Sequence, residues 1–248
     1  MFEPRVALSS LSGESDAEWA KQGSDWAGAA FLGGLALDEQ TREAATRMVE
    51  GRDRSEFRPE DPLAFMETEL AALADTNLRP AFNVRSVENS PFERAAKICT
   101  DHDAILEINA HCRQPEMTEI GAGQALLSDP ERLAEKVETA AAVGATVSVK
   151  VRTEVDGVDL LSLSNRAVEA GADVIHVDAM DSESVVADLA NETEAFIIAN
   201  NEVRDRESVT EYLSYGADAV SVARPSTEPA VLERVGQAVD DWFETADK

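Results

Sequence analysis

A regular alternation along the chain is the feature that most constrains its fold. Short apolar runs rich in β-branched residues are each followed by a longer segment with apolar residues three and four apart. This alternation is typical of a parallel sheet with crossover helices. Eight strands are predicted, at Arg5–Leu8, Ala29–Leu37, Pro80–Arg85, Ala104–Ala110, Thr146–Arg152, Asp173–Asp178, Ala195–Ala199 and Ala219–Ala223. Because eight such units in 248 residues match the usual size of a closed barrel, we predict an α/β fold with a single (β/α)8 barrel domain over residues 1–248.

Three Gly-Ala pairs mark the turns into later strands. They begin at Gly144, Gly171 and Gly216, each just after a segment of helical period. A glycine there is expected to end the helix with a positive φ, so we interpret these glycines as structural. Two stretches lengthen the repeat, an acidic segment over residues 50–75 and a predicted loop over residues 113–130 after the fourth strand.

The charge balance is strongly acidic. The chain carries 22 basic and 49 acidic residues, a formal charge of −27. Such a charge repels nucleic acid and anionic membranes at low ionic strength, and five lysines beside seventeen arginines suggest a salt-adapted, halophilic protein. Two cysteines fit neither a disulfide framework nor a zinc spacing, and we find no export signal and no membrane span, so a cytoplasmic protein without a metal site is expected.

Polar side chains gather where the fourth predicted strand ends. Asn109, His111, Cys112 and Arg113 follow one another there. In a barrel, the loops after the strands build the active face, so these four are candidates for chemistry. A thiol near cations can act as an acid or as a thiolate, and the residues alone leave open whether Cys112 is a catalyst or a small buried apolar residue.

Two further strands carry ionisable residues among β-branched ones. Lys150 lies within the fifth strand and must either point inward to a partner or extend its ammonium to the strand's end. His176 and Asp178 alternate along the sixth strand and therefore share one face. A neutral histidine that serves only packing is the alternative for His176.

The last two strands end in the pattern of a phosphate site. Asn200 and Asn201 follow the seventh strand, and Ala223 and Arg224 follow the eighth. In this fold, backbone N–H groups after these strands bind phosphate monoesters, and an arginine adds a bidentate contact.

Together these segments resemble the dihydrouridine synthase family of flavin barrels, in particular its short archaeal relatives. The resemblance runs from about Pro80 to Pro225, and its strongest motif is Asn109-Ala-His-Cys112, followed by a loop with Gly121-Ala-Gly-Gln-Ala-Leu126. It implies that Cys112 protonates the substrate and that Asn109, His111 and Arg113 lie on the substrate side. The FMN contacts that it implies are Asn83, Lys150, His176, Asn200, Asn201, Ala223 and Arg224.

The sequence departs from the family pattern at several points. The family's early Pro-Met-x-x-x-Thr flavin loop has no clear counterpart over residues 6–12. His111 replaces a glycine beside the cysteine, and Arg113 stands where the family has proline. We also expect no separate RNA-binding domain.

The first hypothesis is therefore an FMN-dependent oxidoreductase acting on a C=C bond of a pyrimidine-type substrate, either tRNA uridine or a smaller free pyrimidine or dihydroorotate-like acid. The resemblance implies a hydride from flavin N5, a proton from Cys112 and NAD(P)H as an expected electron donor. A flavin-free barrel enzyme on a phosphorylated small molecule, with Lys150 as base or Schiff-base amine, is the second hypothesis. A non-enzymatic nucleotide-binding barrel is the third.

Overall fold

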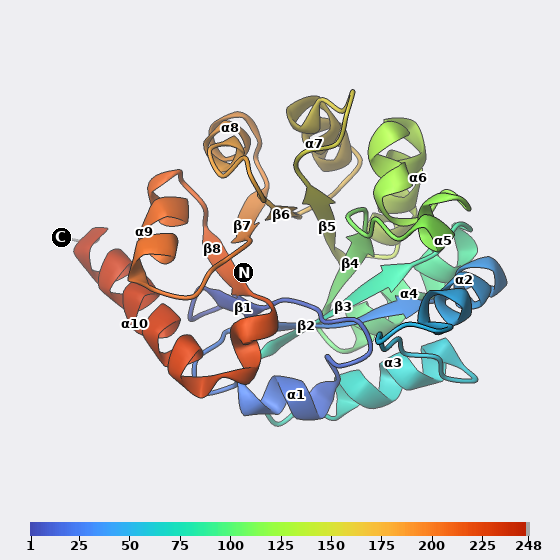
Figure 1. Cartoon of the computed structure of the whole chain (residues 1–248), viewed down its shortest axis with the longest axis horizontal. Coiled ribbons are helices and arrows are strands. Elements are labelled where there is room, and N and C mark those ends of the chain that lie inside the picture. Colours follow the sequence, from blue (N-terminus) through green and yellow to red (C-terminus); the bar gives the residue numbers. More distant parts are fainter. Residues whose placement is uncertain (247–248) are drawn as a thin grey trace.

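Eight parallel strands close into a barrel in the order of the sequence (Figure 1). The computed structural model describes residues 1–246. The strands are β1 Val6–Leu8, β2 Ala29–Ala36, β3 Arg79–Arg85, β4 Ile105–Asn109, β5 Thr146–Arg152, β6 Val174–Asp178, β7 Phe196–Asn200 and β8 Ala219–Val222. β1 pairs with β8 through Ala7 and Ser221, which closes the sheet. The predicted (β/α)8 barrel is confirmed, and the strand ends differ from the predicted ones by at most one residue.

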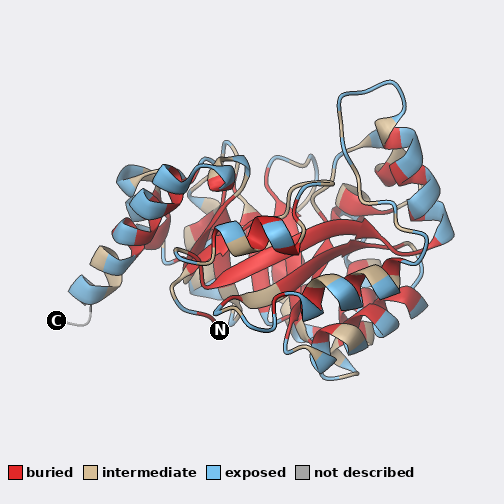
Figure 2. Ribbon diagram, turned by 90° about the horizontal axis from the view of Figure 1, so that it is seen from below, coloured by how far each residue is buried: buried red, intermediate tan, exposed pale blue. Residues whose placement is uncertain are grey.

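Helices surround the strands and pack their apolar faces inward (Figure 2). They are α1 Ala17–Gln22, α2 Glu39–Val49, α3 Pro62–Ala71, α4 Ser90–Asp101, α5 Pro115–Thr118, α6 Pro130–Ala141, α7 Leu160–Glu169, α8 Val185–Glu192, α9 Arg206–Ser214 and α10 Pro229–Ala246, with 3-10 turns η1 Gly123–Ser128 and η2 Arg224–Thr227. Within residues 1–246, none of these helices combines the length and apolar character needed to cross a membrane.

The two irregular stretches contain more structure than their sequences predict. Residues 113–130 form α5 and η1 instead of a plain loop, because Pro115 begins a short helical turn and Gly123 a 3-10 turn. The acidic segment divides into a loop over residues 50–61 and the helix α3, which begins at its N-cap Asp61. The three predicted turn glycines have φ of +81°, +109° and +94°, as expected for the ends of helices.

Alternate strand positions point into the barrel and form layers. The lowest layer is apolar and includes Ala81, Ile105 and Ile198. One step higher on the same strands lie buried polar residues, among them Asn83 and Glu107. This change from apolar to polar along the strands places the polar side chains at the carboxyl ends.

Candidate functional site

A cavity of about 550 Å³ opens at the carboxyl ends of the strands. This volume falls within the range of about 300–1,000 Å³ that small-molecule sites occupy. Residues from the loop after β1 through the start of η2 line it. The position agrees with the active face of a (β/α)8 barrel.

The structure brings ten of the eleven predicted site residues together in this cavity. They are Asn83, Asn109, His111, Cys112, Arg113, Lys150, Asn200, Asn201, Ala223 and Arg224. The exception is His176, which is completely buried one layer beneath the cavity. His176 therefore lies beneath the residues that line the cavity.

His176 belongs to a chain of hydrogen bonds across the barrel. Its Nδ1 lies 2.7 Å from Glu107 Oε2, and its Nε2 lies 2.8 Å from Ser221 Oγ. Asn200 Nδ2 donates to the same Ser221 hydroxyl at 2.6 Å. A neutral His176 with its proton on Nδ1 satisfies every one of these contacts, because it donates to Glu107 and accepts from Ser221.

Glu107 is the centre of this network, and sequence reasoning did not select it. Its carboxylate also accepts from Asn83 Nδ2 at 2.7 Å and from Ser148 Oγ at 3.1 Å. Burial acts to raise the pKa of Glu107, but His176, Lys150 and the Asn83 hydrogen bond outweigh it and lower the pKa. Burial and the Lys150 charge lower the pKa of His176. Both directions agree with an ionised Glu107 beside a neutral His176.

Asn109 holds the loop that carries the cysteine. Its Oδ1 accepts from the backbone N–H of Cys112 at 3.0 Å, while its Nδ2 donates to Asn83 Oδ1 at 2.8 Å. Both ends of the amide therefore bind protein atoms, and the side chain fixes the position of the half-buried Cys112. Burial, followed by the charge of Lys150, lowers the pKa of His111 well below its usual value.

Lys150 lies at the floor of the cavity and has few protein partners. Its side chain is 2% exposed, and Nζ donates to Ser9 Oγ at 2.5 Å. Burial lowers the pKa of Lys150, although Glu107 and Asp178 oppose this effect. An ammonium has three N–H donors, so a buried one with a single hydrogen-bonded acceptor has capacity for an acceptor-rich ligand.

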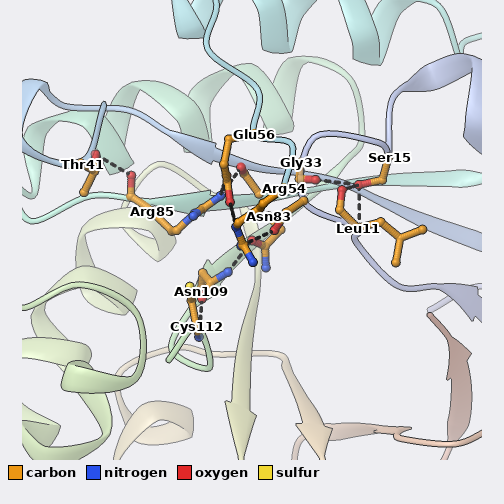
Figure 3. Close-up of polar contacts among 12 residues, drawn as sticks. Leu11, Ser15, Gly33, Thr41, Arg54, Glu56, Asn83, Arg85, Asn109 and Cys112 are labelled. Atoms are coloured by element: carbon orange, nitrogen blue, oxygen red, sulfur yellow. Dashed lines mark hydrogen bonds and ion pairs between the residues drawn. The ribbon is translucent and has the colours of Figure 1, made fainter. Parts of the chain in front are cut away.

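A second cluster, formed by Arg85, Glu56 and Arg54, was also not predicted from the sequence. Arg85 is buried at the end of β3, and its Nη2 donates to Glu56 Oε2 at 2.5 Å and to the Gly34 carbonyl (Figure 3). Glu56 comes from the loop over residues 50–61, and Arg54 binds its other carboxylate oxygen at 2.7 Å. Burial acts to lower the pKa of Arg85, but Glu56 and then Cys112 raise it. The sequence signal was a polar pair, Asn83 and Arg85, at alternate positions of an apolar strand.

The predicted phosphate region lies between the ends of β7 and β8. Asn201 and Glu202 have φ of +124° and +50°, so the chain turns sharply after β7. Ala223 and Arg224 line the cavity opposite them, and η2 begins at Arg224. Within residues 1–246, no ion pair engages the Arg224 guanidinium, which leaves it available to an anion. This donor set suits a phosphate monoester, and Lys150 with the amides of Asn83 and Asn200 suits a polar ring system.

These features define a (β/α)8 barrel with its ligand site at the carboxyl ends of the strands. A family model described as dihydrouridine synthase matches residues 71–247. Since the match covers well over half of the sequence, the chain belongs to the dihydrouridine synthase family. Residues 1–70, with β1, β2 and the loop that carries Glu56, lie outside the match.

Two curated relatives extend the comparison. An uncharacterized protein of Methanocaldococcus jannaschii is 29% identical over 235 residues, 90% of this chain and 89% of its own length. The catalytic subunit of dihydroorotate dehydrogenase B (NAD(+)) of Methanopyrus kandleri is 32% identical over 170 residues, 55% of this chain and 52% of that protein. This second match therefore spans about half of the relative's length.

Solved structures share the fold at low identity. Dihydroorotate dehydrogenase of Eimeria tenella in complex with ferulenol has a TM-score of 0.71 at 13% identity, covering 98% of this chain and 82% of its own. Morphinone reductase in complex with tetrahydroNAD has a TM-score of 0.65 at 13% identity, covering 95% and 87%. These neighbours show the fold, and membership of the dihydrouridine synthase family supports an oxidoreductase.

Proposed function

We propose that the protein is an FMN-dependent oxidoreductase that acts on a C=C bond of a small pyrimidine-type substrate. The observation that carries this proposal is the buried Lys150 ammonium at the cavity floor, in a chain of the dihydrouridine synthase family. Among residues 1–246 this ammonium donates to Ser9 alone. A flavin presents ring oxygens and nitrogens that an ammonium and side-chain amides can bind.

The residues that would hold FMN lie on the strands of the matched region. Lys150 and Asn83 would bind the ring, and Asn200 would support it from β7. His176 would act from below, because it fixes Ser221 and Glu107. Asn201, Ala223 and Arg224 would hold the phosphate. When bound, the flavin supplies hydride chemistry at N5.

Cys112 would give the proton to the second carbon of the reacting bond. The hydrogen bond from its backbone N–H to Asn109 fixes the backbone of Cys112 at the mouth of the cavity. A positioned acid contributes through its placement as much as through its acidity. His111 and Arg113 line the same wall and would orient the substrate, with Asn109 holding the loop.

A free pyrimidine or dihydroorotate-like acid is the substrate we favour over tRNA uridine. One relative is named as a dihydroorotate dehydrogenase subunit, and this supports the choice. The charge of −27 opposes binding of a polyanion only at low salt, where it is not screened. NAD(P)H is the proposed electron donor, and a reducing cytoplasm with high salt is the proposed setting.

The absorption spectrum of the protein purified in high salt tests the cofactor. A flavin band, and FMN identified by mass after heat release, would support the proposal. No flavin even after incubation with excess FMN would reject it in favour of a flavin-free enzyme acting on a phosphorylated small molecule. With flavin bound, Cys112→Ala should lose substrate reduction while it keeps the flavin band; full activity in that variant would contradict the proton-donor role.

A further inference from the structure

Arg85 is a buried cation whose N–H groups are only partly used. Its Nη2 binds Glu56 and the Gly34 carbonyl, whereas Nε and Nη1 are buried and find no hydrogen-bond acceptor among residues 1–246. Buried N–H groups without an acceptor are rare and costly, so a further partner is expected for them. The proposed function gives Arg85 no task.

Cys112 lines the same cavity as Arg85, and an ionised Cys112 would interact with the Arg85 charge. Both side chains belong to the cluster drawn in Figure 3. A thiol is a weak acceptor, but a thiolate is an anion that accepts strongly. Cys112 therefore offers the buried N–H groups of Arg85 a strong acceptor only when it has lost its proton.

The other described surroundings of Cys112 include apolar side chains, and the cations Arg113, Lys150 and Arg152 line the same cavity. The Cys112 side chain packs against an apolar cluster that includes Ala36, Met117 and Ala122. His111 precedes it in the chain, and its imidazole is held neutral by burial. Glu56 and Arg54 act on it through Arg85, since they form one ion-paired group.

We propose that Arg85 is the counter-ion of Cys112 and holds the thiolate that remains after proton transfer. This role in turnover rests on the proposed function. In the step, the S–H bond breaks, the proton goes to one carbon of the C=C bond, and the electron pair stays on sulfur beside Arg85. When bound, FMN would supply the hydride for the other carbon, and a solvent proton would restore the thiol. Arg85 is a positioning residue, because it acts through Cys112.

Glu56 sets the strength of this effect. Its carboxylate neutralises part of the charge that Arg54 and Arg85 present. Removing the Arg85 charge should disfavour the thiolate, while removing the Glu56 charge should favour it. An electrostatic effect therefore predicts opposite shifts in the titration of Cys112 when Arg85 or Glu56 is replaced. A general loosening of the site would instead expose the thiol in both variants.

The pH dependence of Cys112 alkylation by iodoacetamide tests the proposal without flavin or substrate. Peptide mass analysis separates Cys112 from the buried Cys99. We expect Arg85→Gln to raise the midpoint of the alkylation profile by about 1–3 pH units, the usual effect of a neighbouring opposite charge. Glu56→Gln should lower the midpoint, and Arg85→Lys should lie between Arg85→Gln and the parent. Arg113→Gln, which removes an exposed charge next to Cys112, should shift it much less.

An unchanged midpoint in Arg85→Gln, or shifts of the same sign in Arg85→Gln and Glu56→Gln, would overturn the proposal. If Arg85→Gln does not fold, the sign of the Glu56→Gln shift decides it, and no downward shift refutes it. The outcome is independent of the cofactor. A protein without flavin would reject the proposed function and leave the alkylation result standing.

Discussion

His176 Nδ1 lies 2.7 Å from Glu107 Oε2 at the centre of the barrel, and neither side chain is exposed. Removing one partner of such a pair leaves the other buried and unsatisfied. We expect Glu107→Ala to lower the free energy of unfolding by about 3–5 kcal/mol, measured by urea denaturation. The matched control is Glu131→Ala, which breaks an exposed ion pair with Arg166 and should cost no more than about 1 kcal/mol. Equal losses in the two variants would contradict the central role of Glu107.

The pH dependence of stability should follow the two histidines of the site. The pKa of His111 and that of His176 are both lowered from 6.5 by burial and by Lys150. The unfolded chain therefore binds more protons than the folded one below about pH 6.5, so the free energy of unfolding falls as the pH falls. Each fully neutral histidine contributes a slope of about 1.4 kcal/mol per pH unit.

Urea denaturation between about pH 7 and pH 5 measures this slope. His176→Asn should reduce it, whereas His102→Asn, which changes a histidine outside the barrel, should keep it. Glu107 adds a second loss at lower pH, since its lowered pKa stabilises the fold above 4.5 and this contribution disappears as the pH falls below that value. A slope that is the same in the parent and in His176→Asn would refute the assignment of a neutral His176.

Replacing Lys150 should weaken FMN binding, whereas replacing an exposed lysine should not. A hydrogen bond to a charged group contributes about 1.5–3 kcal/mol, so Lys150→Met should weaken the affinity about 10- to 100-fold. Quenching of flavin fluorescence measures the dissociation constant. Lys97→Met, at an exposed position on α4, should leave it unchanged. Parent-like affinity in Lys150→Met would show that Lys150 is not a flavin ligand.

Gly34 leaves room for two polar side chains at the cavity. A Cβ at this position would lie 2.6 Å from Asn83 Oδ1 and 3.1 Å from Arg85 Nη2. Gly34→Ala should therefore displace Asn83 and weaken FMN binding at least about tenfold in the same titration. Gly236→Ala is the control, because its Cβ would meet only ordinary contacts at 3.7 Å and 3.9 Å. That change, inside α10, should stabilise the protein by about 0.5–1 kcal/mol. An unchanged FMN affinity in Gly34→Ala would contradict the expected clash between the new Cβ and Asn83.

The barrel could be predicted from the sequence because its signals are local. Each strand is an apolar run, and each of the three repeated Gly-Ala pairs marks the end of a helix, so neither inference needs a distant contact. The cavity followed from the same rule, since residues at the ends of parallel strands meet at one face. For this reason the sequence predicts that Lys150, Cys112 and Arg224 lie at one face of the barrel.

The residues that were missed depend on long-range pairing. Glu107 lies in the middle of a strand, and its partner His176 is 69 residues away in the chain. Glu56 belongs to an acidic segment whose composition predicts only solvated charge, yet its side chain is buried against Arg85. Burial of a charged group depends on a partner that only the fold supplies. The hydrophobic periodicity of the sequence does not indicate which charged residues pair in the fold.

Residues 1–70 build one wall of the cavity, with Ser9, Gly34 and Arg54, while the floor and the predicted phosphate site come from later strands. Under the proposed function, the side chains that face the substrate and those that would hold the flavin both lie after residue 70, so residues 1–70 shape the cavity without supplying its chemistry. A chimaera that takes this amino-terminal quarter from a homologue should therefore keep the recipient's electron chemistry.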